Sequence, residues 1–441
     1  MFILVCLDPG RQFSIIGLQV VRSGGWFTSN MNNPRVGASG NATVCMLSKY
    51  ISDLNVTVTD GGFSAQPLCT EGFAFLWGGV KATHGVNKGK VCFQVKLEKH
   101  LDVRHLPPDE TSPHIIRVGW STDAASLQLG EDEFSYGYGG TAKFSTRGTF
   151  RDYGVTFRAG DVITACLDYD SDKPIFSYWK NREYIGPVVD VVDSLAGKAL
   201  FPHLLLKNTA VTVNFGQRAQ PYIPVPAGFT LIGALPVGDR VPGPLAPATK
   251  AGCEILMMIG LPGAGKSVWV EKYRREHPEK KYYILGTNSI MDKMKVMGLR
   301  RDRNYNERWE KLFQTANDCL NRFFEKAASH NRNFILDQTN VYSSARERKM
   351  RPFQGFVRKA IVVVPTDEEY RSRITKRSLE EGKMVPDRDV LKMKANFRLP
   401  VEGSLFRQVI FVELGRAAAE QLVRRYNRDG AQAKYSWDPW D

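Results

Sequence analysis

Residues 260–267 read Gly-Leu-Pro-Gly-Ala-Gly-Lys-Ser and match the phosphate-binding pattern GxxxxGK[ST] at every fixed position. The apolar run 254–259 predicts a buried strand before this loop, and residues 268–275 predict a helix after it. Glycines let consecutive backbone N–H groups turn toward phosphates, and the start of a helix adds its positive end. We therefore expect a nucleoside triphosphate site formed by Gly260, Leu261, Pro262, Gly263, Ala264, Gly265, Lys266 and Ser267.

Three side chains give this expected site its chemistry. In such loops the lysine, here Lys266, reaches the β and γ oxygens, and the hydroxyl of Ser267 is a ligand for Mg²⁺. Asp337 follows the apolar run 334–336, where a carboxylate can hold Mg²⁺ through water. Simple capping of the next helix is the alternative for Asp337. We expect ATP and Mg²⁺ as ligands, with Ser267 and Asp337 as the metal-binding residues.

The chain around this loop alternates apolar strands and amphipathic helices from about residue 251 to 430. This alternation predicts an α/β domain with a parallel sheet, whose ligand lies at the carboxyl ends of the strands. The longest helix is expected over residues 307–328, with one apolar stripe in the core. The strands are predicted at 254–259, 282–285, 334–336, 360–364 and 409–412, and the stripe contains Trp309, Leu312, Phe313, Ala316, Leu320 and Phe323.

The first half has a different pattern, because residues 42–232 consist of short strands separated by turn residues. Such regular spacing predicts an all-β sandwich. Loops around residues 77–79 and 136–140 are candidates for a partner-binding surface, with aromatic residues of the core as the alternative. The proline-rich stretch 233–250 is expected to be a stiff connector. Residues 1–41 fit neither pattern, and residues 431–441 are taken as a tail. Strands are predicted at 55–59, 91–97, 115–120, 162–168 and 210–215.

Charge is distributed unevenly between the two halves of this 441-residue chain. Residues 250–441 hold 38 Lys and Arg against 25 Asp and Glu, whereas residues 1–249 hold 22 against 21. A basic half favours a polyanionic partner such as nucleic acid, with a merely solvated basic surface as the alternative. The seven cysteines include no CxxC pair, which indicates reduced core residues instead of a zinc site. No apolar run is long enough to predict a membrane span.

The two halves resemble two known domain types. Gly119–Trp120, the run 134–140 and the run 213–216 resemble a SPRY domain. The phosphate-binding loop together with residues 337–340 and a row of arginines resembles the kinase module of polynucleotide kinases. In this order, the halves resemble the heterogeneous nuclear ribonucleoprotein U family over about residues 42–428. The stretches that match the family most closely are 284–288, 293–301 and 335–342.

The kinase resemblance implies both retained and altered positions. Arg371, Arg373 and Arg377 would form a lid over the transferred phosphoryl group, with Arg373 and Arg377 contacting the nucleotide; a solvated helix face is the alternative. The same resemblance implies a competing role for Asp337, contact with the phosphoryl acceptor. Polynucleotide kinases carry an aspartate and an arginine where this chain has Asn288 and Met291. An amide cannot accept the proton of the acceptor hydroxyl, and a thioether cannot clamp a phosphate. We therefore expect nucleotide binding without 5′-hydroxyl kinase activity, while slow ATP hydrolysis stays open.

The family resemblance implies a nuclear adaptor that binds proteins through its SPRY-like half and ATP through its other half, in RNA processing or in scaffolding of RNA and chromatin. The SAP helices and the Arg-Gly-Gly tail of the family are not found in these residues, so direct RNA contact is left open. Two alternatives are kept: an active polynucleotide or small-molecule kinase, and a direct nucleic-acid binder with a vestigial nucleotide site. We also expect residues 42–232 and 248–430 to fold when expressed separately.

Overall fold

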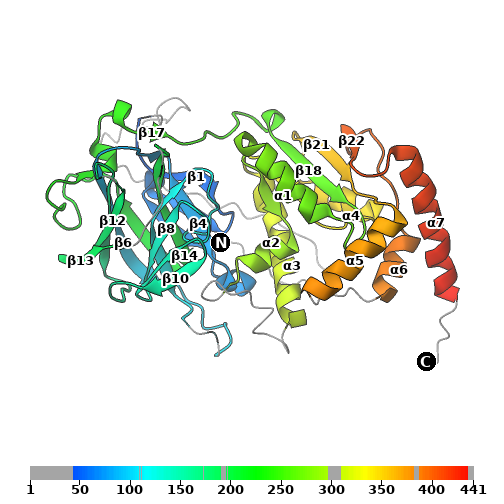
Figure 1. Cartoon of the computed structure of the whole chain (residues 1–441), viewed down its shortest axis with the longest axis horizontal. Coiled ribbons are helices and arrows are strands. Elements are labelled where there is room, and N and C mark those ends of the chain that lie inside the picture. The colour runs from blue at the N-terminus through cyan, green and yellow to red at the C-terminus, as the bar shows by residue number, and fades with distance from the viewer. Residues whose placement is uncertain are drawn as a thin grey trace, which may run out of the picture. The chain divides into compact units, whose positions relative to one another are not determined.

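The structure is a computed structural model that describes residues 43–108, 110, 112–171, 173–189, 195, 197–295, 309–381 and 387–435. The predicted segment 1–41 and residues 436–441 lie outside these ranges. Within them, Thr43–Asp441 forms one compact unit. The predicted combination of an all-β domain and an α/β domain with a parallel sheet is confirmed (Figure 1).

The strands of the first half are short, as their turn-rich sequence predicts. They are β1 (Leu47–Ser52), β2 (Val56–Thr59), β3 (Ser64–Pro67), β4 (Gly78–Ala82), β5 (His84–Gly85), β6 (Lys90–His100), β7 (Ile115–Thr122), β8 (Ser135–Gly139), β9 (Lys143–Thr146), β10 (Thr149–Asp152), β11 (Val162–Asp168), β12 (Ile175–Lys180), β13 (Glu183–Pro187), β14 (Leu200–Lys207), β15 (Thr209–Asn214), β16 (Thr230–Leu231) and β17 (Val241–Pro242).

Two antiparallel sheets make up the sandwich. One has the strand order β1-β4-β14-β7-β8-β9-β10, and the other has the order β13-β12-β11-β6-β15-β3-β2, with β16 added in parallel to β6. Aromatic side chains join the two sheets: Phe93 of β6 meets Trp120 of β7 edge-on at 5.0 Å, and Tyr136 of β8 stacks on Phe176 of β12 at 4.4 Å. The core therefore lies between the sheets, as alternating strand sequences require.

The two predicted partner-binding loops are not on the surface, and this expectation is wrong. Trp77 is buried, and its ring nitrogen donates a hydrogen bond to the carbonyl of Lys295 at 3.0 Å. Residues 135–139 are the buried strand β8, in which Tyr136 and Tyr138 are fully enclosed. Alternating glycine and tyrosine residues suggested a loop. In the structure the tyrosines fill the core, while the glycines allow close strand packing.

The predicted connector is attached to the sandwich. Within the proline-rich stretch, Val241 of β17 pairs with Gly85 of β5, and β16 just before it lies along β6. Proline is tolerated in β17 because this two-residue strand has a partner on one side only. The chain thus forms two further strand pairings with the sandwich before it continues into the second half.

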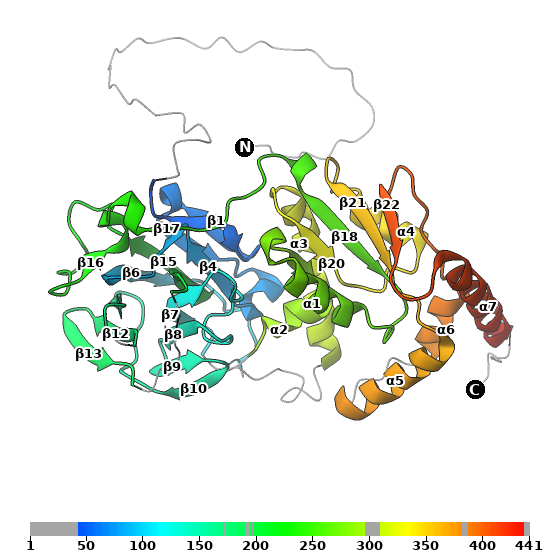
Figure 2. The ribbon, with the colours of Figure 1, turned by 45° about the horizontal axis from the view of Figure 1, so that its top comes forward.

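The second half forms a five-stranded, fully parallel sheet in the order β19-β20-β18-β21-β22, whose strands lie side by side in Figure 2. Its strands are apolar runs, as strands covered on both faces must be. The elements are β18 (Glu254–Ile259), α1 (Lys266–Glu276), β19 (Tyr283–Leu285), α2 (Thr287–Asp292), α3 (Trp309–Ala328), β20 (Phe334–Leu336), α4 (Ser343–Met350), β21 (Val357–Val362), α5 (Asp367–Glu381), α6 (Asp387–Ala395), β22 (Gln408–Phe411) and α7 (Arg416–Tyr435).

Helix α3 confirms most of the predicted apolar stripe. Leu312, Ala316, Leu320 and Phe323 are buried, but Phe313 is 41% exposed. Successive helical residues are turned by about 100°, so Phe313 falls off the stripe that Leu312 begins. The side chain of Trp309 lies outside the described residues. None of the described helices is both long and apolar enough to cross a bilayer.

The first half also contributes to the core of the second half. Leu54, Phe73 and Leu76 are buried in the same apolar cluster as the strands of the parallel sheet, and Phe73 lies 5.4 Å from Phe323 of α3. Beside them, the buried carboxylate of Asp53 forms an ion pair with Lys293. The two halves are therefore joined by a buried contact with apolar and charged parts, as well as by the connector.

Candidate nucleotide-binding site

The phosphate-binding loop joins β18 to α1 and takes a shape that only glycine adopts easily. Gly263 and Gly265 have φ values of 77° and 101°, in the left-handed region. A Cβ atom on Gly260 would lie 2.4 Å from the carbonyl oxygen of Val363, so this position is also restricted to glycine. The loop thus opens its backbone toward the start of α1, where anions are favoured.

Lys266, Ser267 and Asp337 are brought together at this point. Lys266 is buried at the first position of α1 and donates a hydrogen bond to the carbonyl of Leu261 at 2.7 Å. The hydroxyl of Ser267 donates to Oδ2 of Asp337 at 2.6 Å, although the two residues are seventy positions apart. Asp337 directly follows β20, which lies next to β18 in the sheet. The sequence places Asp337 at the end of one strand and Ser267 just beyond the loop that follows another, and the parallel sheet makes them neighbours.

The carboxylate of Asp337 is the most unusual group of the site. Its other oxygen, Oδ1, is buried and has no hydrogen-bond partner among the described residues. Burial raises the pKa of Asp337, and the Ser267 hydrogen bond and the charge of Lys266 lower it only in part. An unsatisfied carboxylate oxygen beside a serine hydroxyl matches the oxygen ligands that Mg²⁺ prefers.

The polar residues 338–340, which the kinase resemblance included, lie beside Asp337 and meet a lysine that sequence reasoning missed. Lys349 of α4 donates to Oε1 of Gln338 at 2.5 Å and to Oδ1 of Asn340 at 2.8 Å, and burial lowers its pKa to about 8. The side chain of Asn340 in turn donates to the carbonyl of Met258 at 2.8 Å, and the backbone carbonyl of Thr339 accepts the N–H of Gly260 at 2.9 Å. These bonds tie the loop after β20 to the phosphate-binding loop. Half of the residues of α4 are charged, so nothing in its sequence singled out Lys349 for this role.

The predicted lid arginines have different surroundings. Arg373 of α5 lies against the phosphate-binding loop and donates to the carbonyl of Ala264 at 2.6 Å. Its guanidinium is also paired with Glu369 at 2.8 Å and with Glu413 at 3.0 Å. Arg371 is exposed. The side chain of Arg377 lies outside the described residues.

The positions that differ from polynucleotide kinases lie on α2. Asn288 is exposed in the first turn of this helix. Met291 is only 9% exposed and belongs to the apolar core, so an arginine at this position would bury a charge. One helical turn thus separates a surface position from a core position. The absence of an arginine at 291 therefore reflects core packing.

The residues present fit a magnesium nucleotide. The glycine cradle has no Cβ atoms in the way, Lys266 supplies a cation, and Asp337 carries an unsatisfied oxygen. No group of three or more His, Cys, Asp or Glu residues suited to a metal occurs among the described residues. A cation here would accordingly rely on Ser267, Asp337 and oxygens of the nucleotide and water, which is how Mg²⁺ usually binds.

Comparisons with known proteins support both domain assignments. Residues 93–218 match the family described as SPRY domain, and residues 255–400 match the family described as AAA domain. The chain is 40% identical over 388 residues to heterogeneous nuclear ribonucleoprotein U-like protein 2 of Homo sapiens. The match covers 88% of this chain and 52% of that protein. The chain is also 28% identical over 267 residues to the ATP-dependent RNA helicase DDX1 of Xenopus laevis. This match covers 59% of the chain and 33% of that protein.

Among solved structures, the SPRY domain of human HERC1 is 18% identical, with a TM-score of 0.29, and the match covers 38% of this chain and 96% of that one. The resemblance to the heterogeneous nuclear ribonucleoprotein U family is confirmed by the similarity to its U-like member across both halves. The chain spans about half the length of the U-like protein that it matches.

Proposed function

From its similarity to the heterogeneous nuclear ribonucleoprotein U family, we propose that this chain is a nuclear adaptor of RNA-containing assemblies. Its SPRY half binds a protein partner, and its other half binds ATP with Mg²⁺ as a switch or assembly element. The names of two relatives, a ribonucleoprotein and an RNA helicase, support the RNA association. The excess of basic residues after position 250 is in keeping with a polyanionic assembly.

The observation that carries this proposal is the contact between Ser267 and Asp337 behind a complete glycine cradle. A serine hydroxyl at 2.6 Å from a carboxylate with a free oxygen is arranged as two neighbouring ligands on one cation. When bound, Mg²⁺ would neutralise phosphate charge at this position. Lys266 would add a second positive charge from the start of α1.

Phosphoryl transfer to nucleic acid is not part of the proposed function. Asn288 occupies the exposed turn from which polynucleotide kinases are expected to present a carboxylate, and its amide cannot take a proton. Arg373 would hold the loop through Ala264, while Glu369 and Glu413 satisfy part of its charge. These features support a site that binds the nucleotide and orders the loop around it.

The proposal is tested by calorimetric titration of ATP with Mg²⁺ into the whole chain and into Lys266→Ala. Removing the side-chain cation of the loop should weaken binding at least tenfold, which corresponds to about 1.4 kcal/mol. Lys272→Ala is the matched control, because this lysine lies on the same helix with its side chain 73% exposed. Equal affinities for the parent and Lys266→Ala would refute nucleotide binding at this loop.

A second measurement separates the adaptor from the kinase alternative. Labelled γ-phosphate is offered with a 5′-hydroxyl oligonucleotide to the parent and to Lys266→Ala. We expect no transfer above background, because general-base assistance worth about 10²–10⁴ in rate is missing. Transfer at ordinary kinase rates of about 1–100 s⁻¹ that disappears in Lys266→Ala would overturn the adaptor interpretation.

A further inference from the structure

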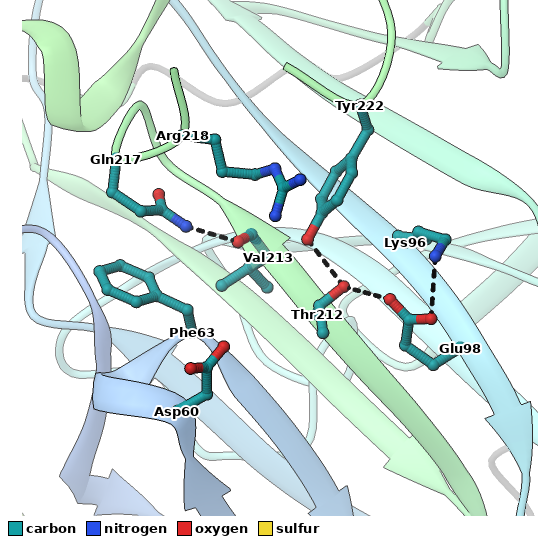
Figure 3. Close-up of a pocket in the computed structure, with 9 residues that line it drawn as sticks. All are labelled: Asp60, Phe63, Lys96, Glu98, Thr212, Val213, Gln217, Arg218 and Tyr222. Atoms are coloured by element: carbon teal, nitrogen blue, oxygen red, sulfur yellow. Dashed lines mark hydrogen bonds and ion pairs between the residues drawn. The ribbon is translucent and has the colours of Figure 1, made fainter. Parts of the chain in front are cut away.

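The SPRY half contains a cavity of about 250 Å³ on the β15 side of its second sheet. Figure 3 shows its side chains, which come from three places: the turn after β2, strands β6 and β15, and the loop that follows β15. This volume is below the range of about 300–1,000 Å³ that is typical for drug-sized ligands. The cavity is therefore suited to one or two side chains of a peptide.

Most polar groups on the β6 and β15 side of this cavity already have partners. Glu98 accepts hydrogen bonds from Thr212 at 2.6 Å and from Lys96 at 2.9 Å, and Tyr222 donates to Thr212 at 2.7 Å (Figure 3). Burial alone would raise the pKa of Glu98, but these hydrogen bonds outweigh it and the pKa is lowered. Glu98 and Lys96 thus neutralise each other and form a fixed wall.

Two charged groups at the cavity form no ion pair with a described side chain, although the charge of Arg218 contributes to the lowered pKa of Glu98. Asp60 forms no ion pair with any described side chain, and its carboxylate accepts only a long hydrogen bond from Ser64 at 3.4 Å. Arg218 likewise forms no ion pair within the described ranges; its guanidinium lies 4.5 Å from the ring of Tyr222 and makes one long hydrogen bond, to Gln220. In Figure 3 the ring of Phe63 lies beside Asp60, while Arg218 reaches in from the opposite loop.

These two groups define the chemistry of a ligand. A cation fits between Asp60 and the face of Phe63, and a planar guanidinium does so best because it can bond the carboxylate and stack on a ring. A carboxylate fits Arg218, which can bind it with two parallel hydrogen bonds. A phosphate backbone is disfavoured at Asp60, because this carboxylate has no cationic partner among the described side chains and would repel it.

We propose that this cavity is the partner site of the SPRY half and that it binds a peptide segment carrying an arginine close to an aspartate or glutamate. This inference rests on the proposed adaptor function and specifies its protein partner. The arginine side chain binds Asp60 and Phe63, and the acidic side chain binds Arg218. The cavity has a site for each sign of charge, so segments with only one sign bind more weakly.

The test selects short random displayed peptides on the whole chain and measures the enriched ones, as labelled synthetic peptides, by fluorescence anisotropy. Asp60→Asn removes the charge and keeps a residue that tolerates the φ of 52° found here. Arg218→Gln removes the other charge at an exposed position. Each should weaken binding by up to about fivefold, the upper value for an exposed ion pair. Arg104→Ala, 91% exposed and outside the cavity, should leave the affinity unchanged.

A change of specificity gives an independent readout. Selection on Arg218→Glu should enrich peptides in which a second basic residue replaces the acidic one. Peptides that bind Asp60→Asn and Arg218→Gln as tightly as the parent would overturn this site, yet would leave the SPRY half as a protein-binding module. Failure to enrich any peptide that depends on Asp60 would also overturn the inference. The inference would be overturned as well if no peptide binds, while single-stranded RNA binds the parent and this RNA binding is lost in Arg218→Gln.

Discussion

Asp337 combines two roles that have opposite effects on the folded chain. Its buried, unsatisfied oxygen suits a cation, but without a cation the ionised carboxylate loses its hydration and gains only one hydrogen bond. Burial raises the pKa of Asp337 for the same reason. A carboxyl group whose pKa is raised on folding contributes stability when it is protonated, and this contribution is lost as the pH rises through the folded pKa.

We therefore expect Asp337→Asn to leave thermal stability unchanged or slightly raised in the absence of ligand, while it weakens Mg²⁺-dependent ATP binding about tenfold or more. The affinity of the parent for ATP with Mg²⁺ should fall as the pH is lowered toward the raised pKa, because a protonated carboxyl cannot bind the metal. Calorimetry at several pH values and a thermal melt check both effects. A variant with lower stability and unchanged Mg²⁺ dependence would contradict this role of Asp337.

Asn288 allows a second test on a single side chain. It is exposed, so Asn288→Asp should fold normally and place a carboxylate near the end of β19. If acceptor geometry is retained, transfer of γ-phosphate to a 5′-hydroxyl oligonucleotide should rise above the parent, within the range of about 10²–10⁴ for general-base assistance. Adding Met291→Arg would bury a charge in the core, so the single change is the cleaner experiment. Unchanged background transfer would place the defect elsewhere in the acceptor site.

At the scale of elements, the first residue of β18 fixes the strand that leads into the phosphate-binding loop. Glu254 accepts hydrogen bonds from Tyr282 at 2.5 Å and from Lys359 of β21 at 2.6 Å, and it pairs with Lys280 at 3.0 Å. Burial alone would raise the pKa of Glu254, but these partners lower it to about 2 from an ordinary 4.5. The carboxylate thus holds β18 against its neighbours at the end opposite the loop.

Glu254→Gln should lower the free energy of unfolding by about 2 kcal/mol at neutral pH, the amount typical for hydrogen bonds to a charged group. Because the pKa of Glu254 is depressed on folding, its contribution is present above about pH 4.5 and is lost as the pH falls toward 2. Urea unfolding at both ends of this window measures the difference. The parent and the variant should converge in acid; a constant difference across the window would argue against this charge effect.

At the scale of the whole molecule, the contact around Asp53 joins the sandwich to the parallel sheet. One of its oxygens accepts the N–H of Gly79 at 2.8 Å, and the other accepts the hydroxyl of Tyr283 at 3.1 Å and pairs with Lys293. Leu54, Phe73 and Leu76 extend the same contact with apolar area. Tyr283 belongs to β19 and Lys293 follows α2, so the sandwich holds the elements next to Asn288.

We now expect the second half to be less stable alone than within the whole chain, in contrast to the simple expectation of two independent domains. Asp53→Ala should destabilise the whole chain by about 3 kcal/mol, because it leaves Lys293 largely buried without its partner. Asp102→Ala is a suitable control, since that carboxylate is 61% exposed. Melts of the whole chain, of both variants and of residues 248–435 test the coupling. A fragment as stable as the whole chain would show that the contact is dispensable.

The sequence by itself determined the phosphate-binding loop, the approximate positions of the five strands around it and the family resemblance. These features depend on residues that are adjacent or regularly spaced, so spacing alone reveals the backbone that they form. Tertiary structure decided which side chains meet: the unsatisfied carboxylate of Asp337, the burial of Met291 and Trp77, and the cavity between Asp60 and Arg218. Each of these depends on strands and loops far apart in the chain that pack together, and no local pattern specifies which faces will be covered.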